Sequence, residues 1–143
     1  MNDKTLAIIK PDAVNDKKAG EIITMISLAG FKIKAMRLVK LTKESAEGFY
    51  EIHKGKAFFE ELIDYMTSGP CIPIALEKEN AVEDYRKLIG ATDPAKAAEG
   101  TIRKLFARNI QFNAVHGSDS DENAVKEISY FFSGKELLEI YPG

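Results

Sequence analysis

Short apolar runs of strand composition alternate along this chain with segments of helical period. The first run, residues 5–9, stops at Pro11, which has no N–H to offer a sheet. Isoleucines at helical spacing then lead to Gly30, a natural C-terminal stop, and residues 31–39 alternate as a strand does. An order of strand, helix and strand requires a fold in which helices pack against a sheet.

The same signals continue along the chain. Thr42 is a suitable cap for a helix from Lys43 to about His53. The other elements that we expect are a helix through residues 58–66, a strand over 71–76, helices through 81–89 and 102–106, a surface loop over 90–100, a strand that ends at Val115, and a helix that starts near Asp121. Pro73 implies a bulge or an unpaired N–H in its strand. This order predicts an α+β sandwich with helices against a small sheet, and it leaves the sheet topology open.

Length and composition indicate one globular domain over residues 1–143. Of the 143 residues, 45% are hydrophobic and 29% are charged, which is enough to bury a core. Residues 1–9 lack the basic flank and cleavage site of a secretion signal, and no apolar run is long enough to span a membrane. The single cysteine, Cys71, is typical of a reducing compartment. We therefore expect a cytoplasmic protein without a membrane segment, with Cys71 as a small buried hydrophobe.

The charge balance argues against a general attraction to nucleic acid. The chain has 20 basic side chains and 22 acidic ones, for a net charge of -2. Any anionic ligand must therefore be held by local contacts. Two histidines and one cysteine, far apart in the sequence, also argue against a dedicated zinc site.

The candidate reactive group is His116, one of the two histidines. The apolar residues before it predict that Val115 ends a strand, and Gly117 permits a tight turn. The segment Ser118-Asp119-Ser120 then supplies good caps for the next helix. We therefore expect His116 to stand at a corner between a strand and a helix.

Glu127 is the expected partner of this histidine. The apolar positions of its helix are Ala124, Ile128, Phe131 and Phe132. Glu127 lies on or beside that buried face, where a carboxylate needs a partner. A histidine held through one ring nitrogen presents the other in a fixed direction, which suits a nucleophile or an acid–base group. The alternatives are a structural histidine at a turn and a solvated helix glutamate.

Several familiar motifs are absent from the sequence. It has no Gly-x-x-x-x-Gly-Lys-Ser/Thr loop, no Gly-x-Gly-x-x-Gly after a strand, and no protein-kinase signature. Ser118 is not part of a Gly-x-Ser-x-Gly elbow, and it follows His116 too closely to guarantee triad geometry. These observations argue against a P-loop enzyme, a dinucleotide-binding enzyme and a serine hydrolase.

The segment Asn113-Ala-Val-His116-Gly-Ser-Asp-Ser120 resembles the active-site signature of the nucleoside diphosphate kinases. The resemblance extends along essentially the whole chain. Further motifs in the order and spacing of the family are Leu6-Ala-Ile-Ile-Lys10-Pro-Asp-Ala-Val14, Ser68-Gly-Pro70, Glu79-Asn-Ala-Val82, Gly90-Ala-Thr92-Asp-Pro94, Gly100-Thr-Ile-Arg103 and Glu127. Several ordered motifs together are far more specific than any one of them.

The resemblance implies a ferredoxin-like α+β fold with a small antiparallel sheet covered by helices. It also implies a ping-pong reaction that moves the terminal phosphate of a nucleoside triphosphate, mainly ATP, to a nucleoside diphosphate. By the same resemblance, His116 carries the phosphate on Nδ1, while Glu127, supported by Ser118, holds the other ring nitrogen. Tyr50 matches a residue beside the imidazole; read without the resemblance, it is a phenol packed on a helix.

Four residues match phosphate contacts of the family. Lys10, Arg86 and Arg103 match its cationic positions, and guanidinium groups suit phosphate oxygens well. Thr92 matches a hydroxyl that contacts phosphate. Without the resemblance, the three cations would be solvated surface groups and Thr92 a loop cap, because spacing alone does not select them.

Two more residues match contacts to the nucleoside. Phe58 matches the residue that stacks on the base, a contact open to purines and pyrimidines alike. Asn113, together with Lys10, matches positions that bond to the sugar. Without the resemblance, Phe58 would be a core residue and Asn113 a turn amide.

The resemblance also implies the cofactor and the partners. Mg²⁺ would arrive bound between the nucleotide phosphates, so no carboxylate cage is needed. The expected partners are ATP, other nucleoside di- and triphosphates, and further copies of the chain in a tetramer or hexamer. The alternative is a non-catalytic nucleotide- or DNA-binding regulator. The intact histidine argues against the nucleotide-binding form, and the acidic balance against the DNA-binding form.

Overall fold

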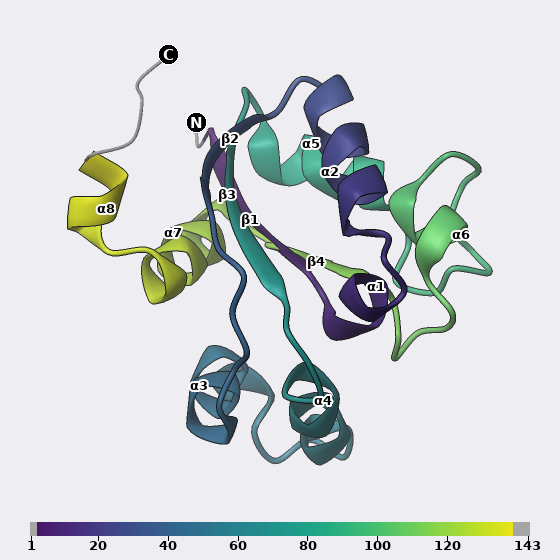
Figure 1. Cartoon of the computed structure of the whole chain (residues 1–143), viewed down its shortest axis with the longest axis vertical. Helices are drawn as coiled ribbons and strands as arrows, with labels where there is room; N and C mark the ends of the chain where they lie inside the picture. Colours follow the sequence, from purple (N-terminus) through teal and green to yellow (C-terminus); the bar gives the residue numbers. More distant parts are fainter. Residues whose placement is uncertain (1–2, 139–143) are drawn as a thin grey trace.

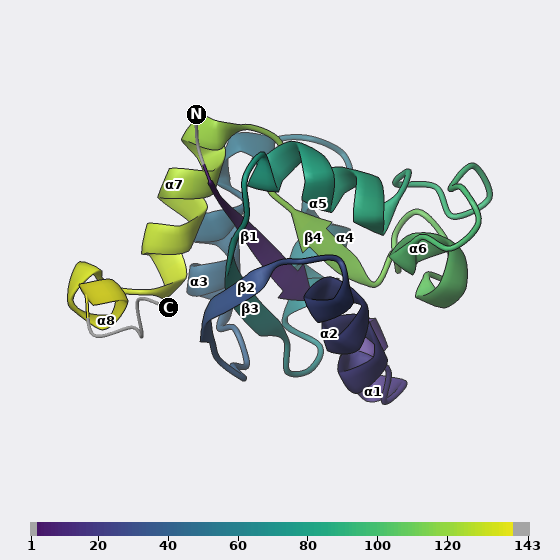
Figure 2. The ribbon, with the colours of Figure 1, turned by 90° about the horizontal axis from the view of Figure 1, so that it is seen from above.

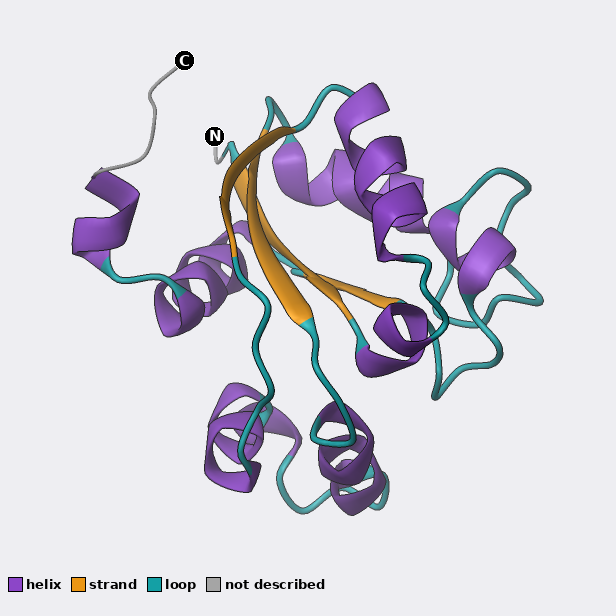
Figure 3. Ribbon diagram, viewed as in Figure 1, coloured by secondary structure: helices purple, strands orange, loops and turns teal. Residues whose placement is uncertain are grey.

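The computed structural model describes residues 3–138, and a four-stranded sheet lies at the centre of this part of the chain (Figure 3). The strands are β1 (Lys4–Ile9), β2 (Lys32–Met36), β3 (Ile72–Glu77) and β4 (Val115–Gly117). Their order is β2-β3-β1-β4, and every neighbouring pair is antiparallel. The helices are α1 (Pro11–Asn15), α2 (Ala19–Leu28), α3 (Lys43–Phe49), α4 (Phe59–Met66), α5 (Ala81–Ile89), α6 (Ile102–Phe106), α7 (Asp121–Phe131) and α8 (Gly134–Leu138).

Strand β1 is buried on both faces because helices cover both sides of the sheet (Figures 1 and 2). Ala7 and Ile9 point into a core formed with α2 and α5. Leu6 and Ile8 point into a second core formed with α3, α4 and α7. The continuous apolar run Leu6–Ile9 is the expected sequence of a strand buried on both faces. This central strand therefore holds the two layers of helices together.

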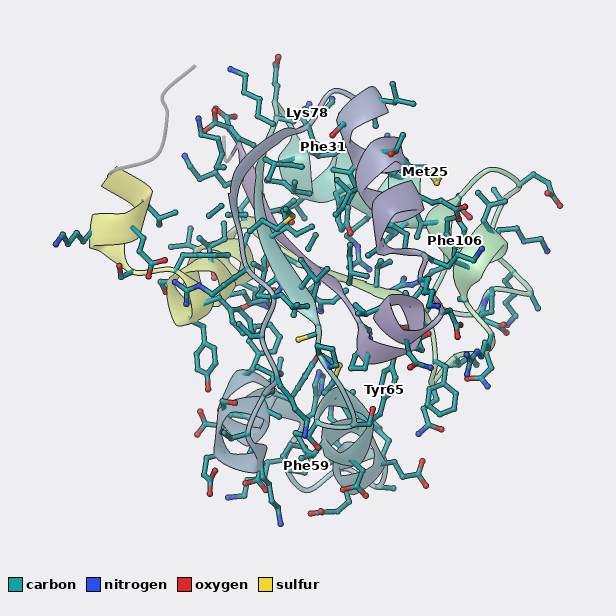
Figure 4. All side chains as sticks on the ribbon, viewed as in Figure 1. Met25, Phe31, Phe59, Tyr65, Lys78 and Phe106 are labelled. Carbon is teal, nitrogen blue, oxygen red and sulfur yellow. The ribbon has the colours of Figure 1, made fainter. Side chains whose placement is uncertain are left out.

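The first core is closed at one end of the sheet by Phe31. Its ring packs edge-on against Tyr85, with centroids 5.8 Å apart, and the ammonium of Lys78 lies 5.7 Å from its centroid (Figure 4). Aromatic pairs in this geometry, and cations over ring faces, are both stabilising contacts.

The arrangement confirms the predicted fold class. The strands and their crossover helices follow the order β1-α2-β2 and β3-α5-β4, which gives two β-α-β units in one antiparallel sheet. This is the split β-α-β arrangement of the ferredoxin-like fold. No helix within residues 3–138 combines the length and the apolar character that crossing a membrane requires.

Helix boundaries follow the predicted capping residues closely. The Thr42 hydroxyl accepts the N–H of Ser45 and caps α3, and the Ser120 hydroxyl accepts the N–H of Asn123 and caps α7. The helix expected to reach about His53 is shorter, because α3 ends at Phe49 and a separate 3-10 turn covers Glu51–His53. The prediction of its start is confirmed, and that of its end is wrong by one turn.

The prediction that Val115 ends a strand is wrong, because Val115 begins β4. Ala114 has a φ of 72°, which breaks the extended backbone before the strand. The Val115 N–H bonds to the Asn113 carbonyl at 2.8 Å instead of to another strand. His116 therefore lies inside β4, opposite Ile8, and not at a corner between a strand and a helix.

Gly117 also differs from its predicted role in a tight turn. It belongs to β4 and pairs with Ala7. A Cβ at this position would lie 2.9 Å from the ring of Tyr85 and 3.1 Å from the side chain of Ile89. The glycine is needed because α5 packs directly on the strand beside the histidine.

Pro73 causes no bulge, and the pairing of β3 with β1 is continuous through the Ile8–Pro73 pair. The Pro73 carbonyl accepts the N–H of Arg37, the residue directly after β2. The nitrogen of Pro73, which carries no hydrogen, therefore also points toward that end of β2. The irregular register lies between Ile33 and Ala35 on β2 instead. Cys71, next to this strand, is fully buried as expected, and burial raises the pKa of its thiol to about 11.

Candidate active site

The side chains of β4, β1 and α7 meet at His116. Because His116 pairs with Ile8, its ring points to the face of the sheet that α3 and α7 cover. There its Nε2 lies 2.7 Å from Oε1 of Glu127. The predicted histidine–carboxylate pair is therefore present in the structure.

Ser118 completes this arrangement from the end of β4. Its hydroxyl is fully buried, donates to Oε1 of Glu127 at 2.8 Å, and accepts the N–H of Leu6 at 3.1 Å. The serine thus ties the carboxylate to the backbone of the central strand. A second partner of this kind fixes the direction in which a histidine is held.

The hydrogen bonds of His116 determine which ring nitrogen is available. The Glu127 carboxylate accepts, so Nε2 carries the proton and Nδ1 keeps its lone pair. Burial lowers the pKa of His116 below its ordinary value of 6.5; the bond to Glu127 opposes this effect, and the charges of Lys10 and Arg103 add to it. The imidazole is therefore neutral, with a free Nδ1, at neutral pH.

Lys10 enters the site because Pro11 ends β1 directly after it and begins α1. Its side chain is buried, and its ammonium donates to Oδ1 of Asn113 at 2.8 Å. The pKa of Lys10 is lowered to about 8, chiefly by burial and then by the charge of Arg103, while the charge of Asp12 opposes both. The lysine and the asparagine predicted to act together are thus in direct contact.

Arg103 is anchored at the base of the site by α6. Its guanidinium donates to the carbonyls of Gly90, Val115 and Asn113 at 3.1, 2.8 and 3.4 Å. These carbonyls belong to the end of α5, to β4 and to the turn before it. A guanidinium has five N–H groups, so donors are left over for a ligand.

Most of the predicted site residues line one cavity of about 620 Å³. The residues of this cavity that were predicted from the sequence are Lys10, Tyr50, Phe58, Thr92, Asn113 and His116. Thr92 also lines a cavity of about 410 Å³, which contains Arg86 and Arg103. Side chains from distant parts of the sequence are therefore brought together around one hollow. Volumes of this size are typical of small-molecule sites.

Phe58 and Tyr50, two of the predicted site residues, differ in their exposure to solvent. Phe58 is not a core residue: the residue is 47% exposed and lines the cavity. Tyr50 is buried, and its hydroxyl has no hydrogen-bond partner among the described residues. Burial raises the pKa of the Tyr50 phenol far above its ordinary range. Tyr50 therefore presents a neutral hydroxyl beside the site.

Comparison with known proteins decides the family. A sequence model described as nucleoside diphosphate kinase matches residues 3–137. The nucleoside diphosphate kinase of Salinibacter ruber is 55% identical over 136 residues, which cover 95% of this chain and 96% of that protein. The chain belongs to the nucleoside diphosphate kinase family.

Further nucleoside diphosphate kinases agree with this assignment. That of Chloroherpeton thalassium is 57% identical over 136 residues, covering 95% of this chain and 96% of that protein. The Aquifex aeolicus nucleoside diphosphate kinase matches with a TM-score of 0.93 at 40% identity, over 99% of this chain and 100% of that one. The Halobacterium salinarum enzyme, solved in complex with CDP, matches with a TM-score of 0.92 at 32% identity, over 100% and 93%. As a member of this family, the chain is a nucleotide-binding phosphotransferase.

Asp12 is a buried residue of this nucleoside diphosphate kinase site that the sequence analysis did not single out. Its carboxylate accepts the hydroxyl of Tyr65 and, at 3.2 Å, the N–H of Ala114. It thereby holds Ala114, whose backbone is in the left-handed region, directly before β4 and its histidine. The available signal was its place in the Lys10-Pro-Asp motif, directly after the strand.

Replacing Ser118 with alanine is expected to destabilise this nucleoside diphosphate kinase by about 1–3 kcal/mol, because the buried N–H of Leu6 loses its acceptor. Urea unfolding with an unchanged m-value measures the loss. Ser129→Ala, which removes an exposed hydroxyl from α7, is the control and should change stability little. Equal stability of the two variants would contradict a structural role for the Ser118 bonds.

Proposed function

We propose that this nucleoside diphosphate kinase transfers the terminal phosphate through His116. Nδ1 attacks the γ-phosphorus of a nucleoside triphosphate, and the bond to the bridging oxygen breaks as the diphosphate leaves. In the second half of the reaction, an oxygen of another nucleoside diphosphate attacks the same phosphorus and the N–P bond breaks. The observation that carries the proposal is the buried ring whose Nε2 is held by Glu127 at 2.7 Å while Nδ1 stays free.

Glu127 and Ser118 act in this proposal by holding the proton of Nε2. As Nδ1 forms a bond to phosphorus, positive charge develops on the ring, and the nearby carboxylate stabilises it. The Ser118 hydroxyl keeps that carboxylate in place. Tyr50 lines the same cavity as His116 and offers a neutral hydroxyl beside the imidazole.

The cations supply the charge that phosphoryl transfer requires. The transition state is loose and spreads charge over the phosphate oxygens, so the protein mainly aligns the groups and neutralises charge. Arg86, Arg103 and Thr92 line one cavity, and Thr92 also faces the cavity of His116. We place the phosphates along this line, from the two arginines toward the imidazole.

Phe58 and the Lys10–Asn113 pair fit the nucleoside. The exposed ring of Phe58 offers a face for any base, and base stacking on aromatic rings tolerates all four bases. The ammonium of Lys10 and the amide of Asn113 are donors for sugar hydroxyls and phosphate oxygens. The Halobacterium salinarum relative was solved in complex with CDP, which supports nucleotide binding by this chain.

The proposed cofactor is Mg²⁺ carried by the nucleotide. Within residues 3–138, no three His, Cys, Asp or Glu side chains form a group that could hold a metal ion. The predicted phosphate contacts are cations and a hydroxyl, which fit a site that receives the metal with its phosphates. When bound, the ion neutralises phosphate charge and orients the γ-phosphate.

We further propose a homo-oligomer, as a tetramer or a hexamer, in the cytoplasm. The edge strand β2 and its continuation expose the apolar side chains of Ile33, Met36 and Leu38, which supports a surface between copies of the chain. Native mass measurement tests the assembly size.

The proposed location in the cytoplasm is a separate point: a single buried cysteine supports a reducing compartment.

Initial-rate kinetics test the proposed reaction. With ATP as donor and GDP as acceptor, double-reciprocal plots at several GDP concentrations should give parallel lines, because the donor leaves before the acceptor reacts. Intersecting lines would indicate direct transfer between two bound nucleotides and would contradict a phosphohistidine. Binding of nucleotide without any exchange would favour the non-catalytic regulator.

The pH dependence of the first half-reaction follows from the lowered pKa of His116. Nδ1 attacks only when the ring is neutral, so phosphorylation should persist below pH 6.5 and fall as the pH drops through the lowered pKa. Rapid-quench rates across pH measure this midpoint. NMR titration of the two histidines should give the same midpoint for His116, and His53→Gln assigns the resonances by removing one of them. A midpoint above the ordinary value would contradict the burial effect.

A further inference from the structure

The bond to Glu127 restrains the His116 ring at one atom, Nε2. Nδ1 lies farther from the Cβ–Cγ axis than Nε2 does, so rotation about that axis displaces Nδ1 over a longer arc than Nε2. The energy of this terminal torsion is broad in histidine. A nucleophile at Nδ1 needs a second restraint on the plane of its ring.

Phe49, at the end of α3, is placed to supply that restraint. Its ring centroid lies 5.4 Å from that of His116, and the two planes meet at 73°, an edge-to-face contact. Phe49 lines the hollow that contains His116 and Glu127, but not the larger cavity that contains Phe58, Lys10 and Asn113. It therefore touches the reactive ring and stays away from the proposed nucleoside contacts.

Phe49 is itself held by three other rings. Its centroid lies 4.9 Å from Tyr50, 5.6 Å from Tyr130 and 5.1 Å from Phe131. Tyr130 and Phe131 belong to α7, the helix that also carries Glu127. One helix thus supplies both the acceptor for Nε2 and the support for the ring that packs on the imidazole.

A hydrogen bond joins α3 to α7. The hydroxyl of Tyr130 donates to the carbonyl of Ser45 at 2.7 Å. A Cβ on Gly48 would lie 2.5 Å from that hydroxyl, so only glycine lets the tyrosine approach α3 this closely. This junction keeps Phe49 against the histidine.

We propose that Phe49 is a positioning residue for the reaction: it fixes the plane of the His116 ring, so that Nδ1 points at the incoming phosphorus. The proposal rests on the proposed function of His116. A misplacement of about 1 Å can cost roughly 100-fold in rate, so losing this contact should slow the chemical step and leave nucleotide binding intact.

The test measures the rate of His116 phosphorylation in a single turnover with saturating ATP and Mg²⁺. Phe49→Leu keeps an apolar side chain but removes the flat ring, and Phe49→Ala removes the contact altogether. We expect losses of about tenfold and about 100-fold, with an unchanged Kd for ATP. In Phe49→Ala, water reaches the imidazole, so the pKa of His116 measured by NMR should rise toward its ordinary value.

Phe132→Leu is the matched control. Phe132 is buried in the same core, its ring lies against the guanidinium of Arg37, and among the described residues it is not part of the lining of the cavities around His116 and Arg103. This variant should lose stability while keeping the phosphorylation rate and the pKa of His116. Equal slowing in Phe49→Leu and Phe132→Leu would overturn the proposal, because it would show a general packing effect. Weaker ATP binding with an unchanged rate at saturation would also overturn it. If the wild-type protein takes no phosphate, the proposed function fails, and the positioning role fails with it.

Discussion

Replacing His116 with alanine is expected to abolish phosphate transfer, with a loss of about 10⁴-fold or more, as is typical when a nucleophile is removed. Glu127 holds Nε2 of His116, so Nδ1 is the ring nitrogen that remains to attack phosphorus in the proposed reaction. Transfer from ATP to GDP measures the loss.

The same variant should still fold and bind nucleotide. The side chain of His116 makes its hydrogen bond to Glu127, while the proposed phosphate and nucleoside contacts are made by Lys10, Arg103 and Asn113. Calorimetry with ATP should therefore give a Kd within a few-fold of the wild type. Measurable exchange by a folded His116→Ala protein would contradict the assigned nucleophile.

Replacing Arg103 with alanine is expected to lower both stability and transfer. The carbonyls of Gly90 and Val115 would lose the donor that Arg103 supplies, while that of Asn113 would keep the N–H of Val115. Each buried polar group left without a partner costs about 1–3 kcal/mol. The loss of a fixed cation beside the proposed phosphate position should reduce transfer at least about 100-fold. Thermal unfolding and the exchange assay measure the two effects separately.

Two variants separate the structural role of Arg103 from its charge. Arg103→Lys keeps a cation, but a single ammonium cannot reproduce the fork that meets three carbonyls, so its stability should also fall. Lys104→Ala removes the neighbouring cation, which is exposed on the same helix, and should leave both quantities nearly unchanged. An Arg103→Ala protein as stable as Lys104→Ala would contradict the anchoring role.

The sequence predicted the parts of the site that depend on local patterns. Helical spacing placed Glu127 near the buried face of its helix, and Ser120 caps that helix as expected. The strand order and the long-range approach of Lys10 to Asn113 came from the family resemblance, because spacing within one element says nothing about distant partners. The structure shows that contact directly.

The errors lie where tertiary packing overrides local preference. A glycine after a histidine reads as a turn, but Gly117 sits in a strand because Tyr85 leaves no room for a side chain. The strand was predicted to end at Val115 because the apolar residues before it resemble a strand, whereas the left-handed Ala114 is held by Asp12 from the other end of the chain. Such a long-range contact has no signature in the local sequence.

The contacts of the aromatic residues also could not be predicted from the sequence. Phe49 lies at the end of α3, and nothing in its spacing along the sequence indicates that its ring meets His116. Phe58, which local reading placed in the core, is exposed beside the cavity, as its resemblance to a base-stacking residue requires. Side-chain exposure in both cases depends on how α3 and α4 pack beyond the sheet (Figure 1).

The most direct test of the central claim is to isolate the phosphorylated protein. Purified protein is incubated with γ-labelled ATP and Mg²⁺, freed of nucleotide, digested at alkaline pH to preserve phosphohistidine, and examined by mass spectrometry; a second portion is chased with unlabelled GDP. We predict one acid-labile phosphate, on His116, that leaves entirely as labelled GTP. A folded protein that binds ATP but takes no label, or a label on another residue that GDP does not remove, would contradict transfer through His116.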